Sequence, residues 1–307
     1  MAKALLNGIN VHYQVKGEGP DVVLVHGITS TLALWYTRIM PALIQDYRVT
    51  MYDLRGHGYT DLTPSGYTSG EMAVDLLALM DHLEIEQARL VGHSFGGSIG
   101  LHLALLHPDR VAGVVLSDTG IACLRRLRTI RDWPGWDLYR DQLAKYGITY
   151  DWFVEAESED VATVIRKSIE IPQQFGPRKG STRATPRFRR LIEETSVSGD
   201  FRQVAGLTEE RLAEITTPVA AVYGETSPYK EMAVHLAGIR PNYSCEILED
   251  IGHFYLLLRP DMFLERISGF LRDPAAYVAD RRGSEGENGE AVRRATGAPP
   301  APSKGRS

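Results

Sequence analysis

The sequence predicts an α/β fold with a mostly parallel, doubly wound sheet. One observation is a set of short apolar runs, such as VVLVHG at residues 22–27, which suit strands buried on both faces of a sheet. The other is that these runs alternate with helical stretches along most of the chain. Strands that alternate with helices form βαβ units, so we expect a parallel sheet with helices on both faces.

The first predicted element is a hairpin. The stretch ALLNGINVHYQVKGEGP at residues 4–20 alternates apolar and polar side chains, and Asn7-Gly8 within it is a strong signal for a tight turn. A strand at residues 22–27 follows. Five further strands are predicted by later segments that contain apolar runs. These segments are YRVTMYDLRGHG, ARLVGHS, VAGVVLSDTG, PVAAVYGET and YSCEILEDIGH.

Two helical stretches are well defined by their patterns. The segment EMAVDLLALMDHLEI at residues 71–85 repeats apolar side chains at helical spacing. The side chains that share its apolar face are Met72, Leu76, Leu79, Met80 and Leu83. The segment RPDMFLERISGFLR at residues 259–272 predicts the last helix of the fold.

Two segments break the alternation of strands and helices. Residues 121–208 hold three of the four tryptophans and show no βα rhythm, so we expect a helical cap inserted between two strands. Residues 274–307 are rich in Gly, Ala, Pro, Ser and charged side chains, which predicts a disordered C-terminal tail. Residues 1–120 and 209–273 then form the α/β core.

Composition excludes several classes of function. The net charge of −5 over 307 residues does not suggest a nucleic-acid-binding protein, and no apolar run approaches the ~20 residues needed to span a bilayer. The start of the chain has no signal-peptide pattern, and Cys123 and Cys245 are too few for a disulfide framework or a cysteine zinc site. We therefore expect a cytoplasmic protein that does not bind membranes. The oligomeric state stays open, with a homodimer as one option.

The motif GHSFGG at residues 92–97 predicts a nucleophile. It follows the apolar run ARLV and opens a helical stretch, so Ser94 lies at a strand-to-helix turn. A serine at such a turn needs small neighbours on either side because the backbone there is sharply bent. The turn lifts the hydroxyl above the sheet and directs the next backbone N–H toward a developing oxyanion.

With this motif the chain resembles the α/β-hydrolase superfamily over about residues 2–272. Three further stretches carry the resemblance: VVLVHG with Trp35 downstream, YDLRGHGYTD, and DIGHFYLLLRPDMF near the end. The resemblance implies the α/β-hydrolase fold with a helical cap between two late strands of the sheet.

The resemblance also implies roles for particular residues. Ser94 matches the nucleophile, which argues against the haloalkane dehalogenases and most epoxide hydrolases because they use Asp there. His253 matches the general base. The backbone N–H groups of Ile28, or a near neighbour, and of Phe95 match the oxyanion hole.

Three other histidines and one loop receive structural interpretations. His26, His57 and His93 lie within motifs where the family uses histidine for packing or for hydrogen bonds to loops. Asp53 and Arg55 are expected to brace their own loop. None of these five side chains is predicted to take part in the chemistry.

The acid of the expected triad is missing from its usual place. The family commonly carries Gly-x-x-Asp after the strand that here reads VAAVYG, whereas this chain has GETSP, with Ser227 in place of the aspartate. Three carboxylates are candidates to orient His253. Asp118 at the end of VVLSD is preferred, because some relatives such as zearalenone lactonases are similar in placing the acid there; Glu225 and Asp250 are the others, and a site without an acid stays open.

These residues predict a serine hydrolase that cleaves an ester or lactone of a mid-sized hydrophobic metabolite, without metal or organic cofactor. One alternative is a cofactor-free lyase or dioxygenase in which His253 and Asp118 act as a base and Ser94 only holds the substrate. Another is a non-catalytic ligand-binding protein of the same fold.

The cap sequence bears on the substrate. Aromatic side chains including Trp133, Trp136 and Trp152 either line a pocket for a bulky substrate or pack the cap onto the sheet. The segment at residues 178–190 is basic, which fits a solvated helix face, an acidic carrier protein or a carboxylated substrate. A solvated face is preferred.

Overall fold

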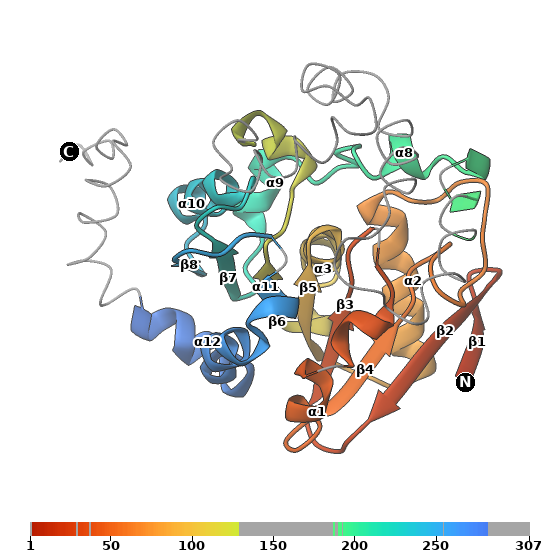
Figure 1. Ribbon diagram of the computed structural model, residues 1–307, viewed down its shortest axis with the longest axis horizontal. Helices are drawn as coiled ribbons and strands as arrows, with labels where there is room; N and C mark the ends of the chain where they lie inside the picture. The colour runs from red at the N-terminus through yellow and green to blue at the C-terminus, as the bar shows by residue number, and fades with distance from the viewer. Residues whose placement is uncertain are drawn as a thin grey trace.

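One eight-stranded sheet forms the centre of the part of the chain that the computed structural model describes (Figure 1). That part is residues 2–281 without residues 29, 37, 129–186, 188–189, 192 and 254. The strand order is β1-β2-β4-β3-β5-β6-β7-β8. The strands are β1 (Ala2–Leu6), β2 (Ile9–Lys16), β3 (Asp21–Val25), β4 (Arg48–Tyr52), β5 (Ala88–His93), β6 (Val111–Ser117), β7 (Val219–Gly224) and β8 (Tyr243–Leu248).

The sheet is antiparallel at one edge and parallel elsewhere. β1 and β2 form the predicted hairpin, with Asn7 and Gly8 at φ of 48° and 78°, the left-handed conformation that a tight two-residue hairpin turn requires. β2 pairs antiparallel with β4, and every later pair of neighbours is parallel. β3 lies between β4 and β5, so the strand order reverses there, and ligands of open α/β sheets bind at such a switch point.

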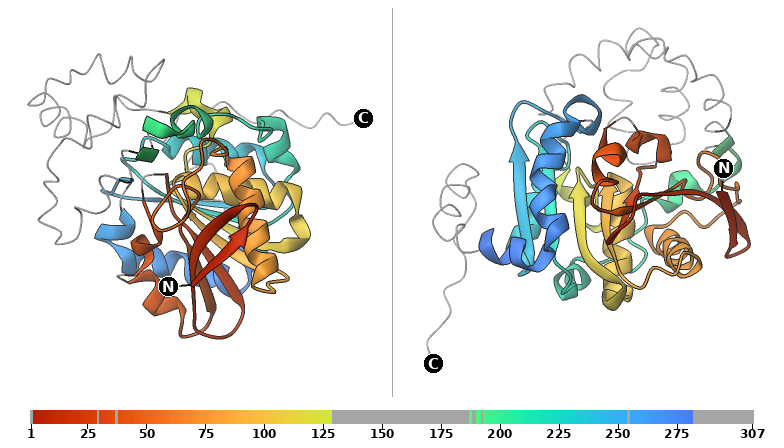
Figure 2. Two further views of the ribbon diagram at one scale, coloured as in Figure 1. Left: turned by 90° about the vertical axis from the view of Figure 1, so that its right-hand side faces the viewer. Right: turned by 90° about the horizontal axis from the view of Figure 1, so that it is seen from below.

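Helices cover both faces of this sheet (Figure 2). The longer ones are α2 (Ser69–His82), α3 (Phe95–Leu106), α10 (Lys230–Ile239) and α12 (Pro260–Arg272). The shorter ones are η1 (Leu32–Trp35), α1 (Ile39–Leu43), η2 (Pro108–Arg110), η3 (Ala122–Leu127), α8 (Val197–Asp200), α9 (Glu209–Glu214) and α11 (Tyr255–Leu258). Buried side chains of α2, α3 and α10 belong to the core on one face, and those of α1 and α12 to the core on the other.

Alternate residues of each central strand serve the two cores. In β3, Val23 and Val25 pack with α2 and α3, whereas Val22 and Leu24 pack on the side of α1 and α12. Since successive side chains of a strand point to opposite faces, a strand covered on both sides must be apolar throughout. The prediction of strands buried on both faces is therefore confirmed.

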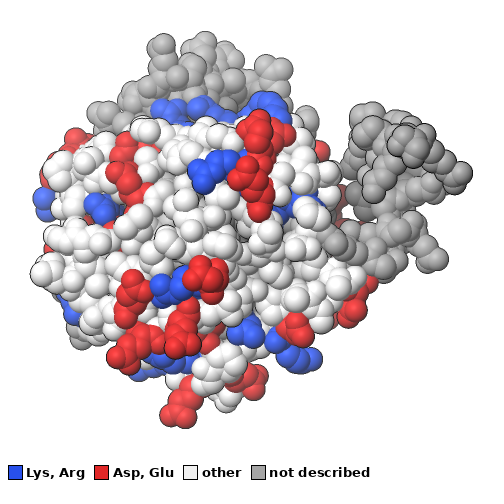
Figure 3. Space-filling model, turned by 180° about the vertical axis from the view of Figure 1, so that it is seen from behind, with Lys and Arg blue, Asp and Glu red and all other residues white. Residues whose placement is uncertain are grey.

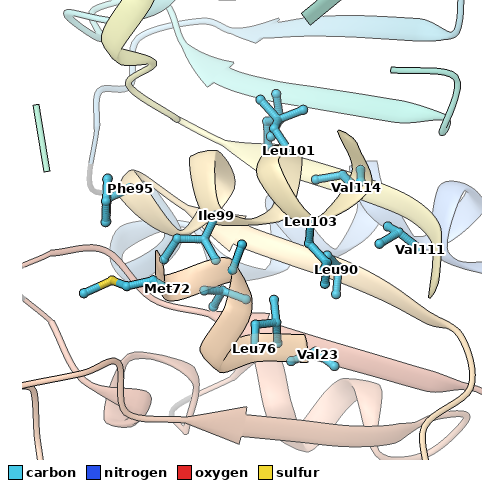
Figure 4. Packing of buried hydrophobic residues seen from close by; sticks show 14 of the residues in the cluster. Val23, Met72, Leu76, Leu90, Phe95, Ile99, Leu101, Leu103, Val111 and Val114 are labelled. Atoms are coloured by element: carbon cyan, nitrogen blue, oxygen red, sulfur yellow. The ribbon is translucent and has the colours of Figure 1, made fainter. Parts of the chain in front are cut away.

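The predicted helix at residues 71–85 is confirmed as α2. It begins with a capping box, in which the Thr68 side chain accepts from the Glu71 N–H and the Glu71 carboxylate accepts from the Thr68 N–H. Met72 and Leu76 lie in one cluster with Ile99 of α3 (Figure 4). Full burial of each such side chain contributes about 1.5–3 kcal/mol to the free energy of folding, so this packing holds α2 against α3.

The prediction of a disordered tail is wrong for its first eight residues. Residues 274–281 are helical, Val278 is buried, and the Tyr277 hydroxyl donates to the Arg266 carbonyl at 2.9 Å. Tyr277 contacts Phe270 of α12 and Val278 belongs to the core cluster on this face, so this helical segment packs on the core rather than extending into solvent. The remaining tail residues, 282–307, lie outside the described residues.

Most of the predicted cap also lies outside the described residues. Residues 129–186, with the three tryptophans of this segment and the start of the basic segment 178–190, are not described. Its two ends are, as η3 (Ala122–Leu127) and α8 (Val197–Asp200) with their neighbouring turns. The cap as a domain stays a prediction.

Three further observations concern membrane-spanning helices, the surface and the cysteines. None of the helices in the described part is long and apolar enough to cross a membrane. On the face in Figure 3, acidic and basic side chains lie close together in mixed groups, with uncharged surface between them. Cys123 and Cys245 are both free thiols and half-buried, and burial raises the pKa of Cys123 to about 11, which makes this thiol a poor nucleophile.

Candidate active site

Ser94 occupies a sharp turn between β5 and α3. Its φ of 53° and ψ of −123° are a conformation that non-glycine residues rarely adopt. The turn brings backbone segments so close that a Cβ on Gly92 would lie 2.4 Å from the Gly97 Cα, and one on Gly96 would lie 2.1 Å from the Val25 carbonyl oxygen. Glycine is therefore required at both positions, as the motif predicts, and strain of this kind often accompanies a functional site.

The loop after β3 lies directly against Ser94. A Cβ on Gly27 would be 2.9 Å from the Ser94 Cβ, and Ile28 lines the same cavity as Ser94 and Phe95. Phe95 is the first residue of α3, so its N–H has no acceptor within the helix and lies at the positive end of the helix dipole. The His57 Nε2 contacts the Ile28 carbonyl oxygen and ties this loop down.

Asp118 lies at the carboxyl end of β6 and contacts His253. The Asp118 Oδ1 is 3.1 Å from the His253 Nδ1, and the Asp118 carboxylate has no exposed area. Two further donors hold it: the Gly224 N–H donates to Oδ2 at 2.9 Å, and the Ser227 hydroxyl donates to Oδ1. A buried carboxylate needs such donors, and their positions leave Oδ1 directed at the imidazole.

The backbone around Asp118 is also tied to the neighbouring strand. The Asp118 N–H donates to the Val222 carbonyl at 3.1 Å, and the Tyr255 hydroxyl donates to the same carbonyl at 3.0 Å. Asp118 itself has a φ of 49°. This left-handed conformation turns the chain at the strand end, and the bonds to β7 hold it in place.

The two rival carboxylates lie elsewhere. Glu225 is exposed, and its side chain accepts from the Asp250 N–H at 3.1 Å. Asp250 is an exposed turn residue with a φ of 56°. Glu225 follows β7 and Asp250 follows β8, and both carboxylates lie at the surface, whereas Asp118 lies against His253. No contact of either with His253 is among the hydrogen bonds and ion pairs of the described residues.

His253 packs against two other rings. The His93 ring lies 5.0 Å from it between centroids, and the Tyr229 ring approaches its edge at 5.3 Å. The His93 Nε2 also contacts the His253 carbonyl oxygen at 3.2 Å. Because His93 immediately precedes Ser94, this packing holds His253 beside the serine turn.

A cavity of about 130 Å³ opens at Ser94. Its described lining comes from five places: the loop after β3, the start of α3, the chain from Gly120 to Arg128, the turn after α8, and the start of α10. The lining residues are Ile28, Ser94, Phe95, Gly120, Ile121, Ala122, Arg125, Arg128, Phe201, Arg202, Tyr229 and Met232. Both described ends of the predicted cap thus contribute to the walls above Ser94.

Comparison with known proteins agrees with this architecture. A family model described as the alpha/beta hydrolase fold matches residues 20–260, well over half of the chain. The chain belongs to the α/β-hydrolase fold family. The resemblance and the fold class expected from the sequence are therefore confirmed.

Relatives of this α/β hydrolase include several kinds of hydrolase. Epoxide hydrolase 2 of Siraitia grosvenorii is 35% identical over 175 residues, which cover 54% of this chain and 53% of the relative, so the chain matches about half the length of that protein. The pimeloyl-[acyl-carrier protein] methyl ester esterase of Nitrosospira multiformis is 26% identical over 277 residues, covering 86% of this chain and 99% of the relative.

Solved structures extend the comparison. Est816, described as an N-acyl homoserine lactone degrading enzyme, aligns with a TM-score of 0.62 at 27% identity, covering 88% of this chain and 100% of the other. The enol-lactonase from Burkholderia xenovorans LB400 aligns with a TM-score of 0.60 at 25% identity, covering 89% and 100%. The family and these relatives support a hydrolase role.

The other histidines of the α/β-hydrolase motifs make structural contacts. The His26 Nε2 accepts from the Leu54 N–H at 3.0 Å and its Nδ1 donates to the Gly27 carbonyl at 2.8 Å. Burial lowers the pKa of His26 and of His93 to about 3 each, so both rings stay neutral. These contacts fit the interpretation that both histidines position loops.

Asp53 and Arg55 brace their loop as expected. Asp53 accepts from the N–H groups of Leu32 and Tyr59, both at 2.9 Å, and backbone and His12 hydrogen bonds help lower its pKa despite burial. Arg55 forms a two-point ion pair with Asp75, at 2.9 and 2.8 Å.

Sequence reasoning missed two features of the site. The role of Ser227 as a donor to the carboxylate of Asp118 was not predicted, although the GETSP motif marks the position. The arginines of the cavity, at 125, 128 and 202, were not singled out either. Arginine is common in exposed loops, so no local pattern distinguishes one that lines a cavity. Among the described residues, no group of three or more His, Cys, Asp or Glu side chains could hold a metal ion.

Proposed function

We propose that this α/β hydrolase is a serine hydrolase that cleaves an ester or lactone through an acyl-enzyme. Ser94 is the nucleophile, His253 the general base and Asp118 the carboxylate that orients His253. The observation that carries the proposal is the 3.1 Å contact between the Asp118 Oδ1 and the His253 Nδ1, beside a serine in the strained turn that nucleophiles of this fold occupy.

The contact supports one tautomer of the imidazole. When the Nδ1–H of His253 donates to Asp118, the Nε2 is left as the acceptor for the Ser94 hydroxyl proton. The carboxylate then stabilises the imidazolium that forms when the serine attacks. His253 returns the proton to the leaving alcohol, and in the second half it takes a proton from the water that releases the acid.

The backbone N–H groups of Ile28 and Phe95 are the proposed oxyanion donors. Both residues line the cavity at Ser94, and Phe95 begins a twelve-residue helix whose dipole favours negative charge at this end. A tetrahedral intermediate formed on Ser94 would carry its oxyanion between these two N–H groups. Removing one such donor typically costs roughly 10²–10³ in kcat.

The proposed substrate class draws on the relatives and on the cavity. The named activities of the pimeloyl ester esterase, Est816 and the enol-lactonase all concern esters or lactones. Apolar lining side chains such as Phe95, Phe201 and Met232 suit a mid-sized substrate with a hydrophobic portion. An ester or lactone of this kind is therefore the proposed substrate.

Labelling with a fluorophosphonate tests the nucleophile. The wild-type protein should be labelled at Ser94 and should hydrolyse para-nitrophenyl esters. Ser94→Ala should lose the label, and its kcat should fall by a factor of roughly 10⁴–10⁶. Ser244→Ala, which alters a buried serine of β8 away from the turn, should keep both.

An outcome without labelling would favour the alternative chemistry. If Ser94→Ala retained more than about a tenth of the activity, Ser94 would not be the nucleophile. Loss of turnover in His253→Ala together with a tolerated Ser94→Ala would then indicate a His–Asp base that removes a proton from the substrate. An unlabelled protein that binds ligands without turnover would indicate a binding role.

A further inference from the structure

Two cavities adjoin each other near the proposed nucleophile. The larger, of about 130 Å³, opens at Ser94, and the smaller, of about 10 Å³, lies beside it. Among the described residues, those that line the smaller cavity alone are Ser69, Ser98, Val204 and Leu207. Those that line both cavities are Phe95, Gly120, Ala122 and Phe201. These last four residues therefore form the described boundary between the two cavities.

Two aromatic rings make up most of this boundary. Gly120 has no side chain and Ala122 has a single methyl group, whereas the rings of Phe95 and Phe201 meet edge to face with 6.2 Å between their centroids. The backbone N–H of Phe95 is one of the proposed oxyanion donors. Phe201 has no such role, so its side chain can shape the substrate site without altering the chemistry at Ser94.

The turn that carries Phe201 is tied to the core. The residue before it, Asp200, accepts from the Tyr67 N–H at 3.2 Å, and the Ser196 N–H donates to the Pro64 carbonyl at 2.8 Å. Both bonds join this turn to the chain that leads into α2. The Phe201 side chain itself packs against the core cluster on the face of α2 and α3. These contacts hold its ring at the boundary between the two cavities.

The smaller cavity suits an alkyl chain. Two of the residues that line it alone are aliphatic. The two hydroxyl groups on its wall already have partners, since the Ser98 hydroxyl donates to the Gly120 carbonyl at 2.9 Å and the Ser69 Oγ lies 3.0 Å from the His102 Nδ1. Methylene groups that enter this cavity would therefore leave neither hydroxyl without a hydrogen bond, and their burial would not be offset by an unsatisfied polar group.

We propose that Phe201 determines the length of the substrate chain, because its ring closes the cavity at Ser94 off from the smaller cavity. This inference rests on the proposed ester or lactone hydrolysis and specifies its substrate, which carries a hydrophobic chain of limited length. A chain that runs from Ser94 along Phe95 ends at the Phe201 ring. Removing that ring joins the two cavities, and each further methylene that is then buried raises kcat/KM by about fourfold.

Two series of esters test the proposal. In one series the acyl group of a para-nitrophenyl ester lengthens from acetate to octanoate, and in the other the alcohol of a butyrate ester lengthens from methyl to octyl. In the series whose chain lies along Phe95, kcat/KM of the wild type should rise with chain length and then fall. Phe201→Ala should move this optimum by about two carbons, and kcat/KM of the ester at the new optimum should rise by about 10-fold.

Changes at Val204 separate the boundary from the space behind it. Val204→Ala enlarges the smaller cavity but leaves the Phe201 ring in place, so the optimum should stay where it is in the wild type. Val204→Phe in the Phe201→Ala background refills the smaller cavity and should return the optimum to shorter chains. Phe201→Leu is a milder change that should move the optimum in the same direction as Phe201→Ala. Thermal unfolding checks that each variant is folded.

Two failures would be distinguishable. If the wild type hydrolyses no ester of either series and Ser94 is not labelled by the fluorophosphonate, the proposed hydrolysis fails, and this inference fails with it. If esters are hydrolysed and Ser94 is labelled, but folded Phe201→Ala or Phe201→Leu keeps the wild-type optimum in both series, then Phe201 does not limit the chain and the hydrolase proposal stands. A shift that Val204→Phe does not reverse would also overturn the inference, because the added room would then lie outside the smaller cavity.

Discussion

The carboxyl ends of β6 and β7 lie side by side and carry opposite hydrogen-bonding roles. β6 is followed by Asp118, a buried acceptor that contacts His253. The N–H of Gly224, the last residue of β7, donates to that same carboxylate, and so does the hydroxyl of Ser227 in the loop that follows. In the family pattern that the sequence resembles, the second loop is the usual place of the acid. Here the acceptor lies on one strand end and its donors lie on the other.

The geometry of parallel strands explains why the acid can lie on either end. Ser117 of β6 pairs with Val222 of β7, and neighbouring strands run roughly 4.8 Å apart. Two loops that leave adjacent strands at the same edge can therefore reach one imidazole. If Asp118 is the acid, the loop after β7 supplies a donor, Ser227, where the family pattern has the acid itself.

The strongest test of this comparison is Asp118→Asn. We expect kcat to fall by roughly 10³–10⁴, because an amide favours the wrong imidazole tautomer and cannot stabilise the imidazolium. Asparagine is nearly isosteric, so the free energy of unfolding should change far less than activity. Steady-state kinetics and urea unfolding measure the two quantities.

Glu225→Gln is the matched control for Asp118→Asn. It removes a carboxylate from the loop after β7, where the family pattern would put the acid, and it should leave kcat within about a factor of two, as for surface substitutions. If Glu225→Gln abolishes turnover and Asp118→Asn stays near wild type, the acid lies on the loop after β7. If neither matters, the site works without a carboxylate.

Replacing the donor Ser227 by a second carboxylate should disturb the contact between Asp118 and His253. In Ser227→Asp, two buried carboxylates would face each other, and their repulsion should displace Asp118 from His253. A displacement of about 1 Å lowers kcat by roughly 10². In the Asp118→Asn background the same substitution should instead raise kcat, because it returns one acid to the site. A double variant slower than Asp118→Asn alone would contradict the idea that either strand end can supply the acid.

Removing the donor alone should have a smaller effect. Ser227→Ala takes one hydrogen bond from the Asp118 carboxylate, and a lost bond to a charged group costs about 1.5–3 kcal/mol. We expect kcat to fall by about 10-fold with little change in KM, since Ser227 acts through Asp118 rather than on the substrate. Ser227→Thr, which keeps the hydroxyl, should restore most of the rate. An unchanged kcat in Ser227→Ala would show that two donors are enough.

The smallest expected effect concerns His93, the neutral imidazole at the end of β5. It is an effect on the free energy of unfolding, and it vanishes at neutral pH. Burial lowers the folded-state pKa of His93 from 6.5 to about 3. Below pH 6.5 the unfolded chain takes up a proton that the folded protein does not, so the free energy of unfolding falls as the pH falls toward 3. One such histidine should account for a loss of about 2 kcal/mol between pH 7 and pH 5.

Urea unfolding at several pH values measures this slope. His93→Gln should reduce the loss between pH 7 and pH 5 by that amount, whereas His82→Gln, at the exposed end of α2, should not. An unaltered slope in His93→Gln would mean that His93 titrates alike in the folded and unfolded chain.

Much of the fold followed from patterns that are local in the sequence. The hairpin at Asn7-Gly8, the apolar strands, and α2 with its single apolar face were predicted because turn chemistry and hydrophobic periodicity act over a few residues. The helical segment at residues 274–281 was missed because composition suggested disorder, although Val278 packs on the core. Average composition does not reveal a single side chain that finds a partner.

Short motifs in the sequence were enough to predict the family, the serine in its glycine-bounded turn, the place of His253 after the last strand and the lack of an acid at residue 227. Each depends on residues within one short motif. The contact of Asp118 with His253, the bond from Ser227 to the Asp118 carboxylate and the shared cavity of arginines from two distant segments came from the folded chain; among the hydrogen bonds and ion pairs of the described residues, neither Glu225 nor Asp250 contacts His253. These facts depend on the register between β6 and β7 and on where side chains point, and such contacts across the fold leave no periodic signal in the chain.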